Sequence, residues 1–201
     1  MKILALELSS AQGSIALRED GRGIFAEEFA NDRKHSGAFF ESLQRCREQF
    51  GNPHRIVVGL GPGSYAGTRI AVATAIGLQA AGNAELIGLP SFCAMATDAE
   101  KYCVVGDARR QSFWMAQVQA RRCVNEPALC TREELAERLL SVSEPISSAE
   151  MLTGFPKVAI CYPSAGILAT IAESLEDVLR APLEPIYLRE PHITQPKTAR
   201  V

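Results

Sequence analysis

The stretch Gly59–Gly77, GLGPGSYAGTRIAVATAIG, decides how the surrounding fold is interpreted. Glycine, proline and serine crowd its first half, and small apolar residues fill its second half at helical spacing. A glycine-rich start to a helix can cradle a phosphate, turn the chain tightly, or let a second backbone approach closely. The composition of the stretch leaves all three uses open.

Two phosphate-binding motifs do not match this stretch. A P-loop needs a lysine after its last glycine, and no lysine occurs between Lys34 and Lys101. The dinucleotide motif GxGxxG has a different glycine spacing. Backbone amides at the helix start can still hold an anion, so we keep a nucleotide or anion site as an alternative. Its candidate contacts are Gly63, Ser64, Arg69 and Arg109.

The helix predicted over residues 67–81 is apolar nearly all round, and one of its sides carries mostly small residues. Such a helix is buried on most sides, either in its own core or against a partner, and the sequence leaves both open. A second helix, predicted over residues 35–50, carries large apolar residues. Together they predict half of a four-helix contact with another subunit. The predicted interface residues are His35, Phe39, Phe40, Leu43, Arg69, Ile70, Ala73, Thr74, Ile76 and Gly77.

The composition is that of a globular protein with a sizeable core. The chain has 201 residues, of which 47% are hydrophobic and 22% charged. A net charge of -2 gives no general attraction to nucleic acid. The six cysteines show neither CxxC pairs nor zinc-ligand spacing, which predicts reduced core thiols. With no signal-peptide pattern and no long apolar segment, we expect a cytoplasmic protein without a membrane partner.

Strands and helices alternate along the chain, which predicts an α/β architecture with mixed sheets flanked by helices. Each half opens with a strand, an acidic residue, a polar turn and a second strand; the acids are Glu7 and Asp107. This weak repeat indicates two related lobes, although two unrelated hairpins would give the same pattern. The predicted strands span residues 2–8, 14–20, 24–30, 55–61, 85–90, both arms of 101–122, and 157–161. Further helices are predicted over residues 91–99, 131–140 and 164–180.

Several segments of the chain also show a family resemblance. GPGSYAGTRI (Gly61–Ile70) resembles the GPGS-[FY]-TG-x-RIG signature of the TsaB family, also called YeaZ. The segments ILALELSS, KHSGAFFESL, GLPSFCAMA, VVGDARRQSFWMAQV and PIYLRE resemble further family segments in the same order. The likeness runs from Ile3 to Arg189 and is weakest from Asn125 to Leu183. The sequence departs from the family pattern at Glu7, Ala66 and Ala71, where the family usually has Asp, Thr and Gly.

The resemblance implies a two-lobed ASKHA fold, the architecture of actin, hexokinase and the heat-shock ATPases. We expect an N-terminal lobe with the partner-binding helices over residues 1–100, a smaller C-terminal lobe over 101–189 and a mobile tail over 190–201. It also implies a role in making N6-threonylcarbamoyladenosine in tRNAs that read ANN codons. In that role a TsaB-like chain binds and activates a TsaD-type transferase, a TsaE-type ATPase joins them, and tRNA is met only through the complex. A homodimer of the free chain and an ADP or ATP at the partner junction are further implications.

The resemblance implies a subunit without catalytic or metal-binding residues and without a cofactor of its own. TsaD-type enzymes carry an HxxxH arrangement on the first helix, whereas His35 is followed by Phe39 at that spacing. One histidine alone does not make a stable metal site. The alternatives are an ASKHA-type small-molecule kinase and a glycoprotease-type peptidase. The sequence lacks the Asp-x-Gly turns of the former and the HExxH and GxSxG motifs of the latter.

Overall fold

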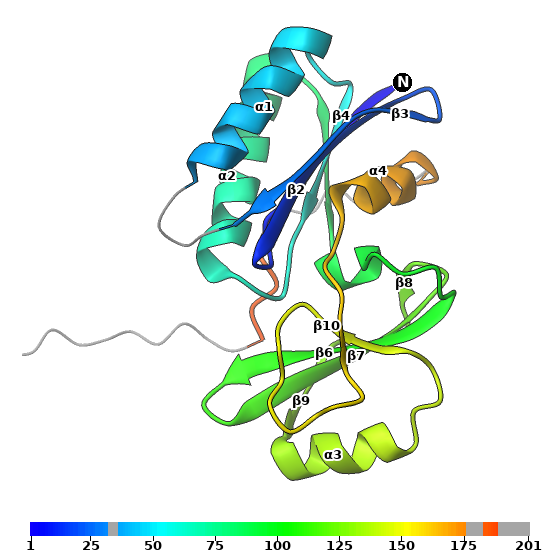
Figure 1. Ribbon diagram of the computed structural model, residues 1–201. Coiled ribbons are helices and arrows are strands. Elements are labelled where there is room, and N and C mark those ends of the chain that lie inside the picture. Colours follow the sequence, from blue (N-terminus) through cyan, green and yellow to red (C-terminus); the bar gives the residue numbers. More distant parts are fainter. Residues whose placement is uncertain (32–35, 176–182, 189–201) are drawn as a thin grey trace, which may run out of the picture.

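The computed structural model describes residues 1–31, 36–175 and 183–188 (Figure 1). Two mixed β-sheets build two lobes, drawn one above the other in Figure 1, and helices flank both sheets. This confirms the α/β class, with two lobes and mixed sheets flanked by helices, that the sequence predicts.

The first sheet contains five described strands in the order β3-β2-β1-β4-β5. Its strands are β1 (Lys2–Glu7), β2 (Gln12–Glu19), β3 (Arg22–Ala30), β4 (Arg55–Gly59) and β5 (Glu85–Leu89). The first three form the predicted antiparallel meander, and β4 and β5 join it in parallel. The parallel strands need crossover connections, and helices supply them.

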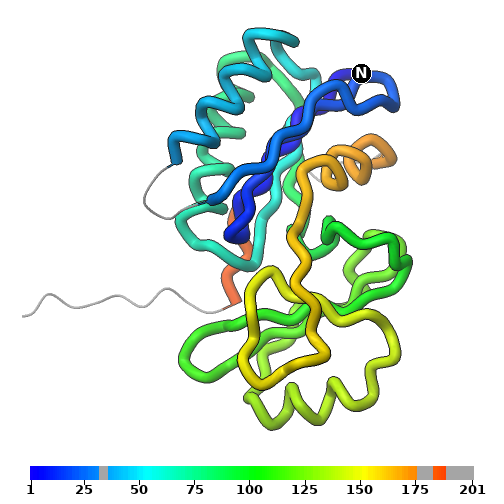
Figure 2. Tube along the Cα trace, in the orientation of Figure 1, coloured from blue at the N-terminus to red at the C-terminus, as the bar shows by residue number. Residues whose placement is uncertain are grey.

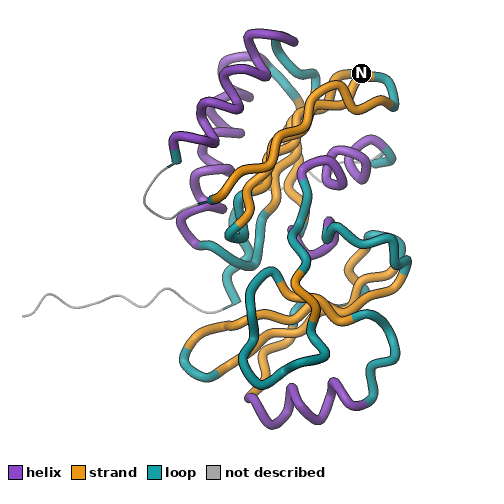
Figure 3. The backbone as a smooth tube through the Cα atoms, in the orientation of Figure 1, coloured by secondary structure: helices purple, strands orange, loops and turns teal. Residues whose placement is uncertain are grey.

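Helices cover both faces of this sheet (Figure 3). On one face, α1 (Gly37–Phe50) and α2 (Tyr65–Gly82) pack over the apolar residues of β1 and β2. On the other face, α4 (Ala165–Glu173) buries its alanines and Leu168 against β1, β2 and β4. Because both faces are covered, β1 and β4 are buried almost throughout.

The second sheet runs in the order β11-β10-β6-β7-β8, and β9 pairs with β7. Its described strands are β6 (Lys101–Arg109), β7 (Ser112–Gln119), β8 (Arg122–Cys123), β9 (Ala128–Thr131), β10 (Ile146–Ser148) and β11 (Ala159–Ile160). One face packs on α3 (Arg132–Leu140), which begins with the predicted capping box of Thr131 and Glu134. The other face packs on the 3₁₀ turn η1 (Ser91–Ala94).

Several element bounds differ from the sequence prediction. Helix α2 begins at Tyr65, two residues early, because Ser64 acts as its N-cap. The helix predicted over residues 91–99 is only the single turn η1, and the strand predicted over 157–161 shrinks to β11. Strand β10 is a buried three-residue strand that was not predicted from the sequence, since it is too short to show a period. The helix predicted over 164–180 ends at Glu173 in the described chain. Residues 176–180 of that prediction and the predicted tail lie outside the described residues.

Helix α4 ties the second half of the chain back to the first sheet. Buried Arg55 on β4 donates from Nη1 to the carbonyl of Ala172 at 2.6 Å. Arg18 on β2 pairs with Glu173 at 3.0 Å. The chain passes from the first sheet to the second near residue 100. However, α4 comes after that point and packs on the first sheet. The division into residues 1–100 and 101–189 therefore remains a prediction.

All six cysteines are free thiols. Cys46, Cys93, Cys103 and Cys130 are buried as predicted, and burial raises the pKa of the Cys93 thiol to about 12. Cys123, in contrast, is exposed, because β8 is a two-residue edge strand. None of the described helices has the length and apolar character needed to cross a membrane.

Candidate partner surface and interlobe cleft

The glycines at the start of α2 let it pack directly on the loop that follows β1. A β-carbon on Gly63 would overlap the carbonyl oxygen of Ser9, and one on Gly67 would overlap that of Leu8. The Ser64 N–H donates to the Ser9 carbonyl at 2.6 Å, while the Ser64 hydroxyl accepts from the Gly67 N–H at 3.3 Å. Gly63 and Gly67 therefore allow two backbone segments of the same chain to approach closely.

The opposite side of α2 faces outward and is apolar. Ala73 and Gly77 are exposed, Ile76 has 46% of its surface exposed, and Ile70 and Thr74 are half-buried. A β-carbon on Gly77 would meet no atom within 4 Å. We define these five residues as the α2 face. Figure 2 shows α1 and α2 side by side on the outside of the first lobe.

Helix α1 contributes less to this surface than the sequence predicted. Phe39 and Leu43 are buried in the chain's own core, where Phe39 contacts Phe29 of β3. The prediction of these two as interface residues is wrong, because the α1 stripe that contains Cys46 faces the sheet. Phe40, one residue on, is turned away and is 47% exposed. His35 lies outside the described residues.

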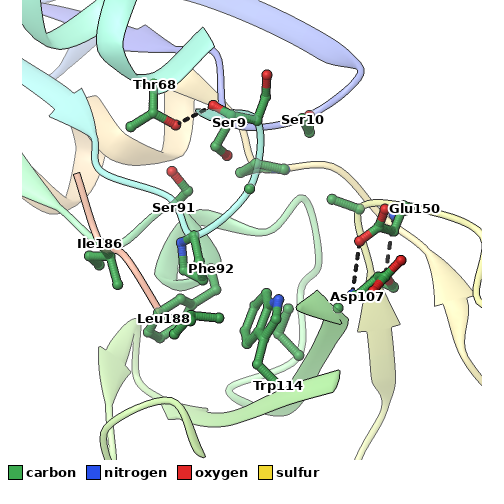
Figure 4. A pocket seen from close by; sticks show the side chains of 18 of the residues that line it. Ser9, Ser10, Thr68, Ser91, Phe92, Asp107, Trp114, Glu150, Ile186 and Leu188 are labelled. Carbon is green, nitrogen blue, oxygen red and sulfur yellow. Dashed lines mark hydrogen bonds between the residues drawn. The ribbon is translucent and has the colours of Figure 1, made fainter. Parts of the chain in front are cut away.

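A cleft of about 390 Å³ lies between the two lobes. Figure 4 shows the serines and Thr68 of the first lobe on one side and Trp114, Asp107 and Glu150 of the second lobe on the other. Its polar lining includes the hydroxyl residues Ser9, Ser10, Ser64, Thr68, Ser91 and Ser148. The Asp107 carboxylate forms an ion pair with Arg109 at 3.1 Å. The backbone N–H of Asp107 donates to the Glu150 carboxylate.

The C-terminal segment Pro185–Leu188 lines one side of this cleft. The Ile186 N–H donates to the Leu60 carbonyl at 2.8 Å. Ile186 and Leu188 pack on the cluster that contains Phe92 and Trp114 (Figure 4). This segment therefore connects the two lobes and takes up apolar surface that a ligand would otherwise contact.

The four predicted anion contacts do not form one site. Gly63, Ser64 and Arg109 line the cleft, whereas Arg69 stands on the exposed side of α2. The Ser64 hydroxyl already caps α2, and the Arg109 guanidinium is paired with Asp107. The part of the chain that the structure describes contains no group of three His, Cys, Asp or Glu side chains able to hold a metal ion.

The sequence matches the family model of TsaD, described as tRNA N6-adenosine threonylcarbamoyltransferase, over residues 21–186. The chain belongs to the TsaD family. A solved Pseudomonas aeruginosa protein, described as uncharacterized and similar to the peptidase YeaZ, superposes with a TM-score of 0.76 at 22% identity over 94% of this chain and 99% of that chain. YeaZ from Pseudomonas aeruginosa superposes with a TM-score of 0.69 at 21% identity over 86% of this chain and 90% of that chain. These likenesses show a shared fold. None of the curated proteins is similar enough in sequence to count as a match.

In this TsaD-family chain, the acidic residue of the first hairpin is withdrawn from the cleft. Glu7 is fully buried and its Oε1 accepts from the Ser9 N–H at 2.6 Å, while its Oε2 has no hydrogen-bond partner among the described residues. Burial raises the pKa of the Glu7 carboxyl, and hydrogen bonding from Ser9 offsets part of that rise. The two hairpin acids are therefore not equivalent, since Asp107 lines the cleft and Glu7 does not.

Sequence reasoning missed the aromatic residues at this site. Tyr65 and Tyr187 are 122 positions apart in the chain, but both line the cleft and their ring centroids lie 5.6 Å apart. The motifs that contain them, GPGSYAGTRI and PIYLRE, were found separately. No period or spacing relates the two segments, so only the fold brings them together.

Proposed function

We propose that the chain is a non-catalytic subunit that binds and activates a TsaD-type threonylcarbamoyltransferase in tRNA N6-threonylcarbamoyladenosine biosynthesis. The observation that carries this proposal is the α2 face. It exposes Ala73, Ile76 and Gly77 on an 18-residue helix whose single charged residue is Arg69. Small residues let a partner helix come close, and exposed Phe40 on α1 extends the apolar surface.

The lining of the interlobe cleft favours an accessory subunit rather than an enzyme that transfers a phosphoryl group. Glu7 is buried, Asp107 is engaged by Arg109, and the C-terminal segment covers apolar surface within the cleft. A kinase needs acidic and cationic groups that are free to meet metal and phosphate. The cleft volume still favours the small-molecule kinase as the second candidate, since it would admit a compact ligand.

The remaining parts of the proposal follow family resemblance. A TsaE-type ATPase joins the complex, tRNA is met through the complex, and ADP or ATP binds at the partner junction. The subunit works in the cytoplasm and brings no catalytic or metal-binding residue of its own. In the absence of its partner, two copies of the subunit pair through the same α2 face.

The proposal is tested by placing a charge on the α2 face. Ala73→Arg and Gly77→Arg should remove binding to the TsaD-type paralogue of the same organism, because an unpaired charge in a desolvated contact costs about 3 kcal/mol or more. Ala136→Arg, at an exposed alanine of α3 in the other lobe, is the matched control. Binding is measured by calorimetry and folding by circular dichroism.

Folded variants that bind the paralogue as the unmodified chain does would rule out this surface. The kinase alternative makes a different prediction: the isolated chain would bind ATP tightly and phosphorylate a small molecule. Calorimetry with ATP and the isolated chain separates the two functions.

A further inference from the structure

The Arg69 guanidinium is oriented by a tyrosine and forms no ion pair with the described residues. Its guanidinium carbon lies 5.0 Å from the ring centroid of Tyr65, and its Nη1 donates to the Tyr65 hydroxyl. It is the one charged residue of α2, and no carboxylate pairs with it within residues 1–31, 36–175 and 183–188. The side chain therefore has a defined direction, and none of the described carboxylates forms an ion pair with it.

Tyr65 is supported in turn by the C-terminal segment. The Tyr187 ring lies against it at a tilt of 40°. The hydrogen bond from Ile186 to Leu60 and the packing of Leu188 on the second lobe fix Tyr187 from both sides. Although they are large aromatic residues, Tyr65 is 52% and Tyr187 45% exposed. Three side chains from two distant segments thus form one ordered, exposed cluster.

The position of this cluster relates it to the α2 face. Tyr65, Arg69, Ala73 and Gly77 follow one another at intervals of four residues, so they lie along one side of the helix. Arg69 stands about 12 Å along the axis from Gly77. The cluster is therefore the polar end of the same surface.

We propose that Tyr65, Arg69 and Tyr187 form an anchor that receives a carboxylate of the TsaD-type partner. The inference rests on the proposed function and adds the chemistry of the contact. A guanidinium that is already ordered loses little entropy on binding, and it can hold a carboxylate through two parallel hydrogen bonds. Tyrosine and arginine are also the residue types that carry most binding energy in interfaces.

A carboxylate fits this place better than a nucleic-acid phosphate. Binding to a phosphate backbone normally uses several cations side by side. The rest of α2 supplies none, and the whole chain carries a net charge of -2. A single guanidinium at the end of an apolar face suits one acidic residue beside an apolar partner helix.

The test measures binding of this chain to the TsaD-type paralogue of the same organism at low and at high salt. Arg69→Glu should raise Kd at least about 30-fold, and Tyr187→Ser, which removes the support of Tyr65, about 3-fold to 10-fold. Arg138→Glu, at an exposed arginine of α3, is the matched control and should leave Kd unchanged. Reversing one acidic residue of the paralogue to lysine should restore binding of Arg69→Glu.

The possible failures are distinguishable. If the unmodified chain does not bind the paralogue, the proposed function is wrong and this inference falls with it. If the unmodified chain binds and Arg69→Glu binds equally well, only the anchor is wrong. If a folded Arg69→Glu variant binds the paralogue normally but its complex loses affinity for tRNA, the proposed carboxylate contact is wrong. Arg69 would then contact RNA.

Discussion

The carboxylate of Glu7 occupies the space that a side chain on Gly59 would need. The two residues lie at the carboxyl ends of the neighbouring parallel strands β1 and β4, and a β-carbon on residue 59 would overlap Glu7 Oε2. Glutamate is one methylene longer than the aspartate usual in the family. The missing side chain at Gly59 is what makes room for that methylene.

This relationship predicts a compensating pair of substitutions. Gly59→Ala should lower the free energy of unfolding by about 2 kcal/mol, because it overpacks a buried strand. Combining it with Glu7→Asp should recover part of that loss, since the shorter acid withdraws from the new methyl group while the Ser91 hydroxyl still lies close to it. Urea denaturation of both single variants and the double variant measures the coupling. A double variant whose loss equals the sum of the two single losses would show that these residues do not compete for space.

Glu7 also predicts a dependence of stability on pH. Burial raises the pKa of its carboxyl above the ordinary value of 4.5, so the folded state holds the proton to higher pH than the unfolded state does. Stability should therefore fall as pH rises from 4.5 through the raised pKa, and the loss should persist at neutral pH. Glu7→Gln keeps an oxygen acceptor for the Ser9 N–H and carries no charge. It should be more stable than the unmodified chain at pH 7 and should lack this slope.

Thermal unfolding followed at several pH values checks that prediction. Below pH 4.5 the two proteins should differ least, because Glu7 is then protonated in both the folded and the unfolded state. A Gln variant that is less stable at pH 7 would mean that the buried carboxylate is stabilised by its surroundings after all.

The order of strands and helices could be predicted from the sequence because hydrophobic period and turn residues are local signals. The structural role of each glycine could not be predicted in this way. Gly67 and Gly77 stand in the same helix with similar neighbours, but one lies against a carbonyl and the other faces open space. Phe39 and Phe40 are likewise adjacent, and only the helical rotation relative to the sheet decides which is buried.

The two glycines of α2 therefore predict opposite results for the same substitution. Gly67→Ala should destabilise the protein by about 2 kcal/mol or more, because the methyl group meets the Leu8 carbonyl and the whole start of α2 must move. Gly77→Ala should stabilise it by up to about 1 kcal/mol through helix propensity. Denaturation midpoints compare them directly. Equal effects would contradict the packing described for the start of α2.

The segment Pro185–Leu188 predicts a change that the protein's single tryptophan can report. Trp114 is buried in the cluster on which Ile186 and Leu188 pack. Ile186→Ser should lower the free energy of unfolding by about 1–3 kcal/mol through lost apolar contact, and it should make Trp114 easier to quench with acrylamide. Glu184→Ser, at the exposed position directly before this segment, is the matched control. If folded Ile186→Ser is quenched no more than the control, the segment does not shield Trp114. The packing of its neighbours would then not be what holds Tyr187 in place.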